Sequence, residues 1–137
     1  MSGSNDKTCQ VWSISKKQKL YSVEHGYEIY HVHLLSDQNL DFDLITASLD
    51  KTVKLWRQGK VVKTLKHFEI CRSFDLDKEN RLLAVATRDG VTLWRLDRHE
   101  KIAEEKIGST VDIRFNENAT KIIAATYYGP VYQMSLE

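Results

Sequence analysis

The sequence predicts an all-β protein built from a repeated unit of about 40 residues. The phrase SNDKTCQVW at 4–12 returns as SLDKTVKLW at 48–56, with Ser, Asp, Lys, Thr and Trp in the same places. Between and after these phrases lie short runs of β-branched, aromatic and apolar residues separated by polar turns, a pattern typical of strands. No long segment has the spacing of an amphipathic helix. A phrase repeated at this distance indicates a repeat architecture.

Composition limits the class of protein and of partner. The 137 residues are 42% hydrophobic and 28% charged, which fits a globular domain with a core. A formal net charge of +1 gives no electrostatic reason to expect nucleic acid or an anionic membrane as partner. The chain lacks both the roughly 18–20 apolar residues of a membrane helix and the apolar segment of a secretory signal. Two cysteines, Cys9 and Cys71, favour a reduced intracellular protein, cytoplasmic or nuclear, and Cys9 is expected in the core.

Each full repeat is expected to hold four strands in the same order. LDKT at 49–52 is a turn because Asp50 can accept hydrogen bonds from the backbone a few residues on. KIAEEKI at 101–107 has some helical propensity, but its place in the repeat favours a strand. The expected strands are 28–35, 44–48, 52–57 and 60–66, then 70–76, 82–87, 91–96 and 101–107, and finally 110–115, 121–126 and 130–136.

Tryptophan marks the end of the third strand in successive repeats. Trp12, Trp56 and Trp94 are separated by 44 and 38 residues, and Gln133 is expected at this position in the last repeat. Four antiparallel strands in about 40 residues, with a Trp ending the third strand, resemble the WD-repeat family. The resemblance implies that each repeat is a four-stranded blade of a β-propeller, with its Trp buried between stacked sheets.

The resemblance divides the chain into a blade remnant at 1–24, two blades at 25–66 and 67–107, and a three-strand blade at 108–137. These make about three blades in an open arc, whereas closed propellers usually have 4–8. The sequence begins inside the second strand of a blade, so we expect a truncated piece of a larger propeller. The alternative is an arc that associates with other copies or with missing blades.

In this family a His, a Ser or Thr, an Asp and the Trp form one hydrogen-bonded set, in which the hydroxyl reaches the indole N–H. The resemblance implies that set twice in full, because buried polar groups need partners. Its members are His25, Ser48, Asp50 and Trp56 in the second repeat and His67, Thr87, Asp89 and Trp94 in the third. The first repeat shows only Ser4, Asp6 and Trp12, and the last keeps Thr126 alone. Because the set recurs in successive blades, we interpret it as structural and expect neither catalysis nor a cofactor.

Function is therefore expected on the loops, as a protein–protein interaction scaffold or adaptor. Aromatic and arginine residues commonly anchor interfaces. The candidate protein-binding residues are Leu49, Arg88, Tyr127, Tyr27, Tyr30 and Phe68. WD-repeat chains include substrate receptors of ubiquitin ligases, so a substrate-recognition role in such a ligase is one alternative, and a fragment without independent activity is another. The weakest alternative is a metal-dependent enzyme that uses His31 and His33, two residues apart on one face of a strand.

Overall fold

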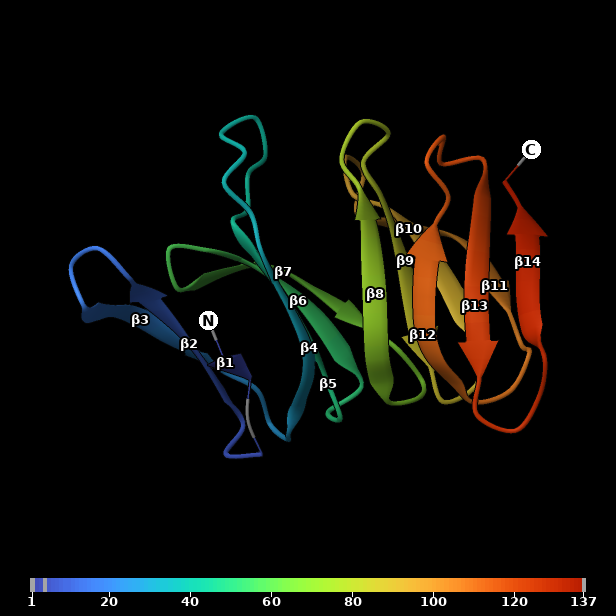
Figure 1. The fold of residues 1–137 in the computed structure, drawn as a ribbon, viewed down its shortest axis with the longest axis horizontal. Coiled ribbons are helices and arrows are strands. Elements are labelled where there is room, and N and C mark those ends of the chain that lie inside the picture. Colours follow the sequence, from blue (N-terminus) through green and yellow to red (C-terminus); the bar gives the residue numbers. More distant parts are fainter. Residues whose placement is uncertain (1, 4, 137) are drawn as a thin grey trace. The chain divides into compact units, whose positions relative to one another are not determined.

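The computed structural model describes residues 2–3 and 5–136, and every regular element in them is a strand. The prediction of an all-β protein made of antiparallel sheets is confirmed (Figure 1). The strand expected at 101–107, in spite of its helical propensity, is present as β11 (Glu100–Glu105). The chain divides into two compact units, residues 1–70 and 71–137, which are described separately.

The first unit contains two antiparallel sheets. One has three strands in the order β1-β2-β3, and the other has four in the order β4-β5-β6-β7. Val and Leu alternate with polar residues along β6, so one side chain in two faces the interior. The strands are β1 (Ser2–Gly3), β2 (Thr8–Ser13), β3 (Gln18–Glu24), β4 (Ile29–Leu34), β5 (Leu44–Ser48), β6 (Thr52–Arg57) and β7 (Lys60–Lys66).

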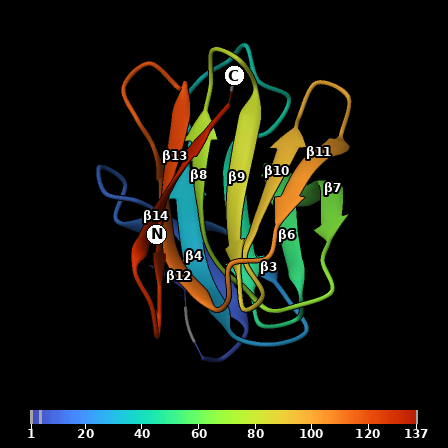
Figure 2. The same ribbon diagram turned by 90° about the vertical axis from the view of Figure 1, so that its right-hand side faces the viewer.

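The second unit repeats this plan with the three-stranded sheet last. Its sheets have the orders β11-β10-β9-β8 and β12-β13-β14, and Figure 2 shows the first of them as a regular series from β8 to β11. β9 carries the apolar run LLAVAT and is almost wholly buried, as the inner strand of a packed sheet must be. The strands are β8 (Cys71–Asp77), β9 (Leu82–Thr87), β10 (Val91–Arg95), β11 (Glu100–Glu105), β12 (Thr110–Phe115), β13 (Lys121–Thr126) and β14 (Val131–Ser135).

The repeated phrase folds into the same turn at both of its positions. Lys7 and Lys51 each adopt a left-handed backbone conformation, with φ of 73° and 70°. The preceding aspartate fixes the turn, because its Oδ1 accepts the backbone N–H of the threonine two residues on, at 2.9 Å from Thr8 to Asp6 and 3.0 Å from Thr52 to Asp50. A carboxylate that accepts a hydrogen bond from the backbone two residues on stabilises a turn.

The core of each unit lies between its two sheets. In the first unit Cys9, Val11 and Val23 pack against Leu44 and Trp56. In the second unit Val91 and Leu93 pack against Ile113, Ile122 and Ala124. The expectation that Cys9 is a core residue is confirmed, and Cys71 is buried as well.

Strand register identifies the residue at the tryptophan position of each sheet. Trp56 lies opposite Leu44, and Trp94 lies opposite Leu83. In the last sheet Met134, not Gln133, lies opposite Ile122, so the expectation for Gln133 is wrong by one residue. The turn between β13 and β14 is one residue longer than the turn between β9 and β10, and this shifts every later position.

Candidate functional site

The central group of polar residues in the first unit surrounds His25, which lies between β3 and β4. Its backbone N–H donates to the Lys7 carbonyl at 2.9 Å, so the turn of the preceding sheet fixes its place. The His25 Nδ1 lies 2.9 Å from the Asp50 Oδ2, and its ring packs edge-on against Trp56 with the ring centres 6.0 Å apart. The His25 side chain is fully buried, and Asp50 is held beside it at the turn between β5 and β6.

The hydroxyl that joins His25 to the indole belongs to Thr46, in the middle of β5. Its Oγ1 lies 2.5 Å from the His25 Nε2 and accepts the Trp56 Nε1–H at 2.9 Å. The prediction that Ser48 fills this role is therefore wrong. Thr46 and Ser48 face the same side of the strand because side chains alternate with period two, and Thr46 lies one step nearer the level of Trp56.

Ser48 closes the loops around this group instead. Its hydroxyl donates to the Glu28 carbonyl at 2.8 Å, and it accepts the Asp50 backbone N–H at 3.1 Å. The Leu49 backbone N–H also donates to the Glu28 carbonyl, at 2.9 Å. Two bonds to one carbonyl thus tie the turn after β5 to the loop before β4, which positions the side chains that both segments expose.

The charges of this group follow from burial and from hydrogen bonding. Desolvation lowers the pKa of His25 below its ordinary value, because it outweighs the attraction of Asp50. Burial alone would raise the pKa of Asp50, but hydrogen bonds from Thr52, the Gly26 N–H and His25 lower it overall. At neutral pH an ionised Asp50 therefore accepts Nδ1–H from a neutral His25, and the His25 Nε2 accepts from the Thr46 hydroxyl.

This arrangement satisfies the polar atoms of three buried side chains, His25, Thr46 and Trp56, and of the half-buried Asp50, and offers nothing to a substrate. Thr46 is fully buried, and its oxygen is already engaged by both His25 and Trp56. A hydroxyl in that position cannot reach an external carbonyl, although Asp, His and a hydroxyl resemble a nucleophilic triad in composition. The group therefore acts on the stability of the fold.

The third repeat differs at the hydroxyl position. Register places Val85 where Thr46 stands, so no hydroxyl is present there. Thr87 takes the place of Ser48 and serves its turn in the same manner, accepting the backbone N–H of Asp89 at 3.2 Å. His67 repeats the backbone bond of His25, since its N–H donates to the Lys51 carbonyl at 2.9 Å. His67 belongs to the first unit, and Asp89 and Trp94 belong to the second. The contacts of His67 with Asp89 and Trp94 therefore stay a prediction.

The first repeat keeps only the turn. Asp6 accepts both the N–H and the hydroxyl of Thr8, at 2.9 and 2.7 Å, and Ser4 lies outside the described residues. Trp12 is 49% exposed whereas Trp56 is 4% exposed, so the expectation of a buried tryptophan is wrong for Trp12. Trp56 packs against the sheet that precedes its own along the chain, and within the described part of this unit no sheet precedes β1–β3.

The candidate interface residues lie on loops and strand ends. Tyr27, Tyr30 and Phe68 are exposed in the first unit, with Phe68 84% exposed, and Leu49 is half-buried. Arg88 and Tyr127 are exposed in the second unit. Tyr128 is not among the interface candidates predicted from the sequence. It is 92% exposed and packs edge-on against Tyr127 at 4.6 Å between ring centres.

His31 and His33 lie on β4, half-buried and exposed respectively. Residues 2–3 and 5–136 contain no group of three or more His, Cys, Asp or Glu side chains arranged to hold a metal ion. In the same residues no helix has the length and apolar character needed to span a bilayer.

One stretch of the first unit matches a known protein family. Residues 17–57, from β3 through β6, match the family described as WD domain, G-beta repeat. The chain belongs to the WD-repeat family. This WD-repeat chain is 37% identical over 59 residues to the small ribosomal subunit protein RACK1 of Schizosaccharomyces pombe, an overlap of 41% of this chain and 19% of that protein. It is 30% identical over 122 residues to a coronin-like protein of Saccharomyces cerevisiae, an overlap of 76% of this chain and 19% of that protein.

A solved structure shows the same fold. The WD40 β-propeller domain of Doa1 aligns with a TM-score of 0.73 over 89% of this chain and 41% of that chain, at 24% identity. The WD-repeat chain thus spans less than half of the length of each of these proteins. Propellers of this family are generally non-catalytic and bind other proteins.

Proposed function

We propose that this WD-repeat chain is a non-catalytic scaffold that binds another protein through the loops at the ends of its strands. The observation that carries the proposal is the exposure of large aromatic side chains on loops whose backbones are fixed. Phe68 and Tyr127 are exposed although each is a large apolar residue, and a side chain of that kind commonly anchors an interface. The proposed partner is a protein, in the cytoplasm or the nucleus.

Rigid support favours binding over simple loop exposure. The Tyr127 N–H donates to the Ser109 carbonyl at 2.8 Å, as the Leu49 N–H donates to the Glu28 carbonyl in the first unit. A loop held in one conformation loses less entropy when it binds, so more of the contact energy remains as affinity. Each unit therefore presents one supported set of side chains: Tyr27, Tyr30, Leu49 and Phe68 in the first, and Arg88 and Tyr127 in the second.

The proposal is tested by affinity purification with quantitative mass spectrometry on the full chain. One variant carries Tyr27→Ala and Phe68→Ala, and a second carries Arg88→Ala and Tyr127→Ala. Ile14→Ala is the matched control, since Ile14 is 92% exposed but lies in the turn between β2 and β3, outside both sets. We expect at least one double variant to lose partners that the control retains, with unchanged circular dichroism. An identical set of partners for all three variants contradicts the proposal.

Two alternatives have distinct outcomes. A substrate-recognition role in a ubiquitin ligase, drawn from the family resemblance, requires ligase subunits among the purified partners. A fragment without independent activity yields no protein that depends on either set. The proposal also allows self-association, which light scattering on the purified chain detects as a mass above 15.9 kDa.

A further inference from the structure

Each unit packs two sheets face to face, but the two units fill the space between their own sheets with different side chains. In the first unit the outer part of this space holds Tyr21 and Val23 of β3 and Trp56 of β6. Register gives the equivalent positions in the second unit. Tyr21 lies opposite Val11 as Ala103 lies opposite Leu93, Val23 opposite Cys9 as Glu105 opposite Val91, and Trp56 opposite Leu44 as Met134 opposite Ile122.

These replacements remove a phenol ring and an indole and add a carboxylate. Tyrosine becomes Ala103, tryptophan becomes Met134, and valine becomes Glu105. A cavity of about 290 Å³ lies at this place in the second unit, between β10–β11 and β13–β14. An apolar cavity of about 150 Å³ already holds a benzene ring, so this one has room for an indole. Its lining is Val91, Leu93, Ala103, Glu104, Glu105, Ile122, Met134, Ser135 and Leu136.

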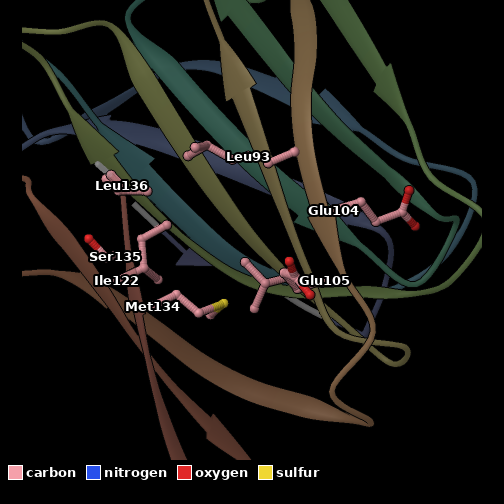
Figure 3. Close-up of a pocket in the computed structure, with 9 residues that line it drawn as sticks. Leu93, Glu104, Glu105, Ile122, Met134, Ser135 and Leu136 are labelled. Carbon is pink, nitrogen blue, oxygen red and sulfur yellow. The ribbon is translucent and has the colours of Figure 1, made fainter.

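Glu105 gives the cavity a charge preference. Figure 3 shows Glu105 beside Met134 and Ile122, whereas Glu104 extends away from them. The Glu104 carboxylate is already engaged by Lys101 at 3.0 Å. Within residues 2–3 and 5–136 the Glu105 side chain forms none of the ion pairs, so its carboxylate can pair with a cation that a ligand brings to the cavity.

We propose that this cavity binds an aromatic side chain of a partner protein that carries a lysine or arginine next to it. The rings of the first unit show what shape the space between such sheets accepts, since an indole and a phenol pack there against Leu44 and Val11. Glu105 replaces an apolar residue at that place and complements an adjacent cation. The site uses none of the loop residues of the proposed interface, and it stands or fails independently of them.

The test uses a short peptide as probe and Met134 as reporter. The chain has two methionines, Met1 and Met134, so labelling of methionine methyl groups gives two NMR signals that a Met134→Leu variant assigns. The probe Ac-Lys-Trp-Lys-NH2 is titrated into the full chain. We expect the Met134 methyl signal to move by the ring current of the bound indole, with no saturable shift from Ac-Lys-Ala-Lys-NH2.

Three variants separate the cavity from a general attraction between the peptide and the surface. Ala103→Tyr restores the residue that Tyr21 provides in the first unit and should abolish the shift. Ile102→Tyr adds the same ring on the same strand outside the cavity lining and should leave the affinity within about twofold of wild type. Glu105→Gln should weaken binding about two- to fivefold, the range of one exposed ion pair. If Ala103→Tyr fails to fold, Ala103→Leu fills part of the same volume and should weaken binding at least fivefold.

Four results overturn the proposal. They are no movement of the Met134 signal at millimolar peptide, equal binding of Ac-Lys-Leu-Lys-NH2, equal binding of Ac-Glu-Trp-Glu-NH2, and unchanged affinity in folded Ala103→Tyr. The second removes the aromatic preference and the third removes the role of Glu105. The first and the fourth remove the site.

Discussion

Replacement of Thr46 by valine tests the group of hydrogen bonds in the first unit. Valine has nearly the shape of threonine, and Val85 occupies the equivalent place in β9 fully buried, so the change introduces no clash. It leaves the Trp56 indole N–H and the His25 Nε2 buried without their partner. Each unsatisfied buried group costs about 1–3 kcal/mol, so two give about 2–6, and relaxation around the site brings our expectation to about 3 kcal/mol.

The measurement is urea unfolding of the full chain, followed by circular dichroism and by tryptophan fluorescence because two units can unfold separately. Hydrogen exchange of the Trp56 indole gives an independent value, and a loss of about 3 kcal/mol makes it roughly a hundredfold faster. Ser48→Ala is the matched control. It removes a partly buried bond to a backbone carbonyl and should cost about 1 kcal/mol. The reasoning is refuted if Thr46→Val is as stable as wild type, or if Ser48→Ala is the more damaging change.

Three further predictions follow from burial, charge and close packing. Trp56→Ala should cost about 3–5 kcal/mol, whereas Trp12→Ala should cost less than about 1 kcal/mol because half of that indole is exposed; equal losses in urea unfolding would contradict this difference. Because the pKa of His25 is lower in the folded chain than its ordinary 6.5, its contribution to stability is complete above that pH and is lost as the pH falls below it. Wild type should therefore lose more stability between pH 7.5 and 5.5 than His25→Gln does, while exposed His33→Gln should follow wild type in the same denaturation series. Gly90→Ala should lower the melting temperature and accelerate amide exchange in β11, because an added Cβ would lie 2.0 Å from the Glu105 carbonyl; an unchanged melt would show that β10 and β11 can separate at little cost.

Repetition predicted the strands and the turns of this chain because both depend on local chemistry. The letters D-K-T fix a turn by bonds between neighbours, and alternation of apolar residues fixes which face of a strand is inside. The predicted identity of the joining hydroxyl failed for a different reason. Thr46 and Ser48 both project to the correct face, and only the register of β5 against β6 decides which of them meets the indole.

The errors at the two ends of the chain have the same non-local origin. Trp12 matches Trp56 in its local sequence, but burial depends on a facing sheet that its own segment does not encode. Met134 could have been placed at the tryptophan position if the extra residue in the turn before β14 had been counted, since Gly129 and Pro130 signal that turn. The cavity beside Met134 left no signal in the sequence, because it arises from three positions on two strands, β11 and β14, that only the register relates.

In the first unit the Asp50 carboxylate serves both the turn before β6 and the series of hydrogen bonds that runs through His25 and Thr46 to Trp56. The turn can nevertheless form without the series. Asp6 shapes its turn with Thr8 although the neighbouring tryptophan is half in solvent. Loss of the deeper bonds in one repeat can thus leave that repeat's hairpin intact, and damage need not spread along the chain. Repeat proteins of this kind can therefore retain their fold while single repeats lose part of their hydrogen-bonded set. The residues D-K-T in a sequence then indicate a turn of the backbone, and they do not by themselves indicate the buried polar contacts.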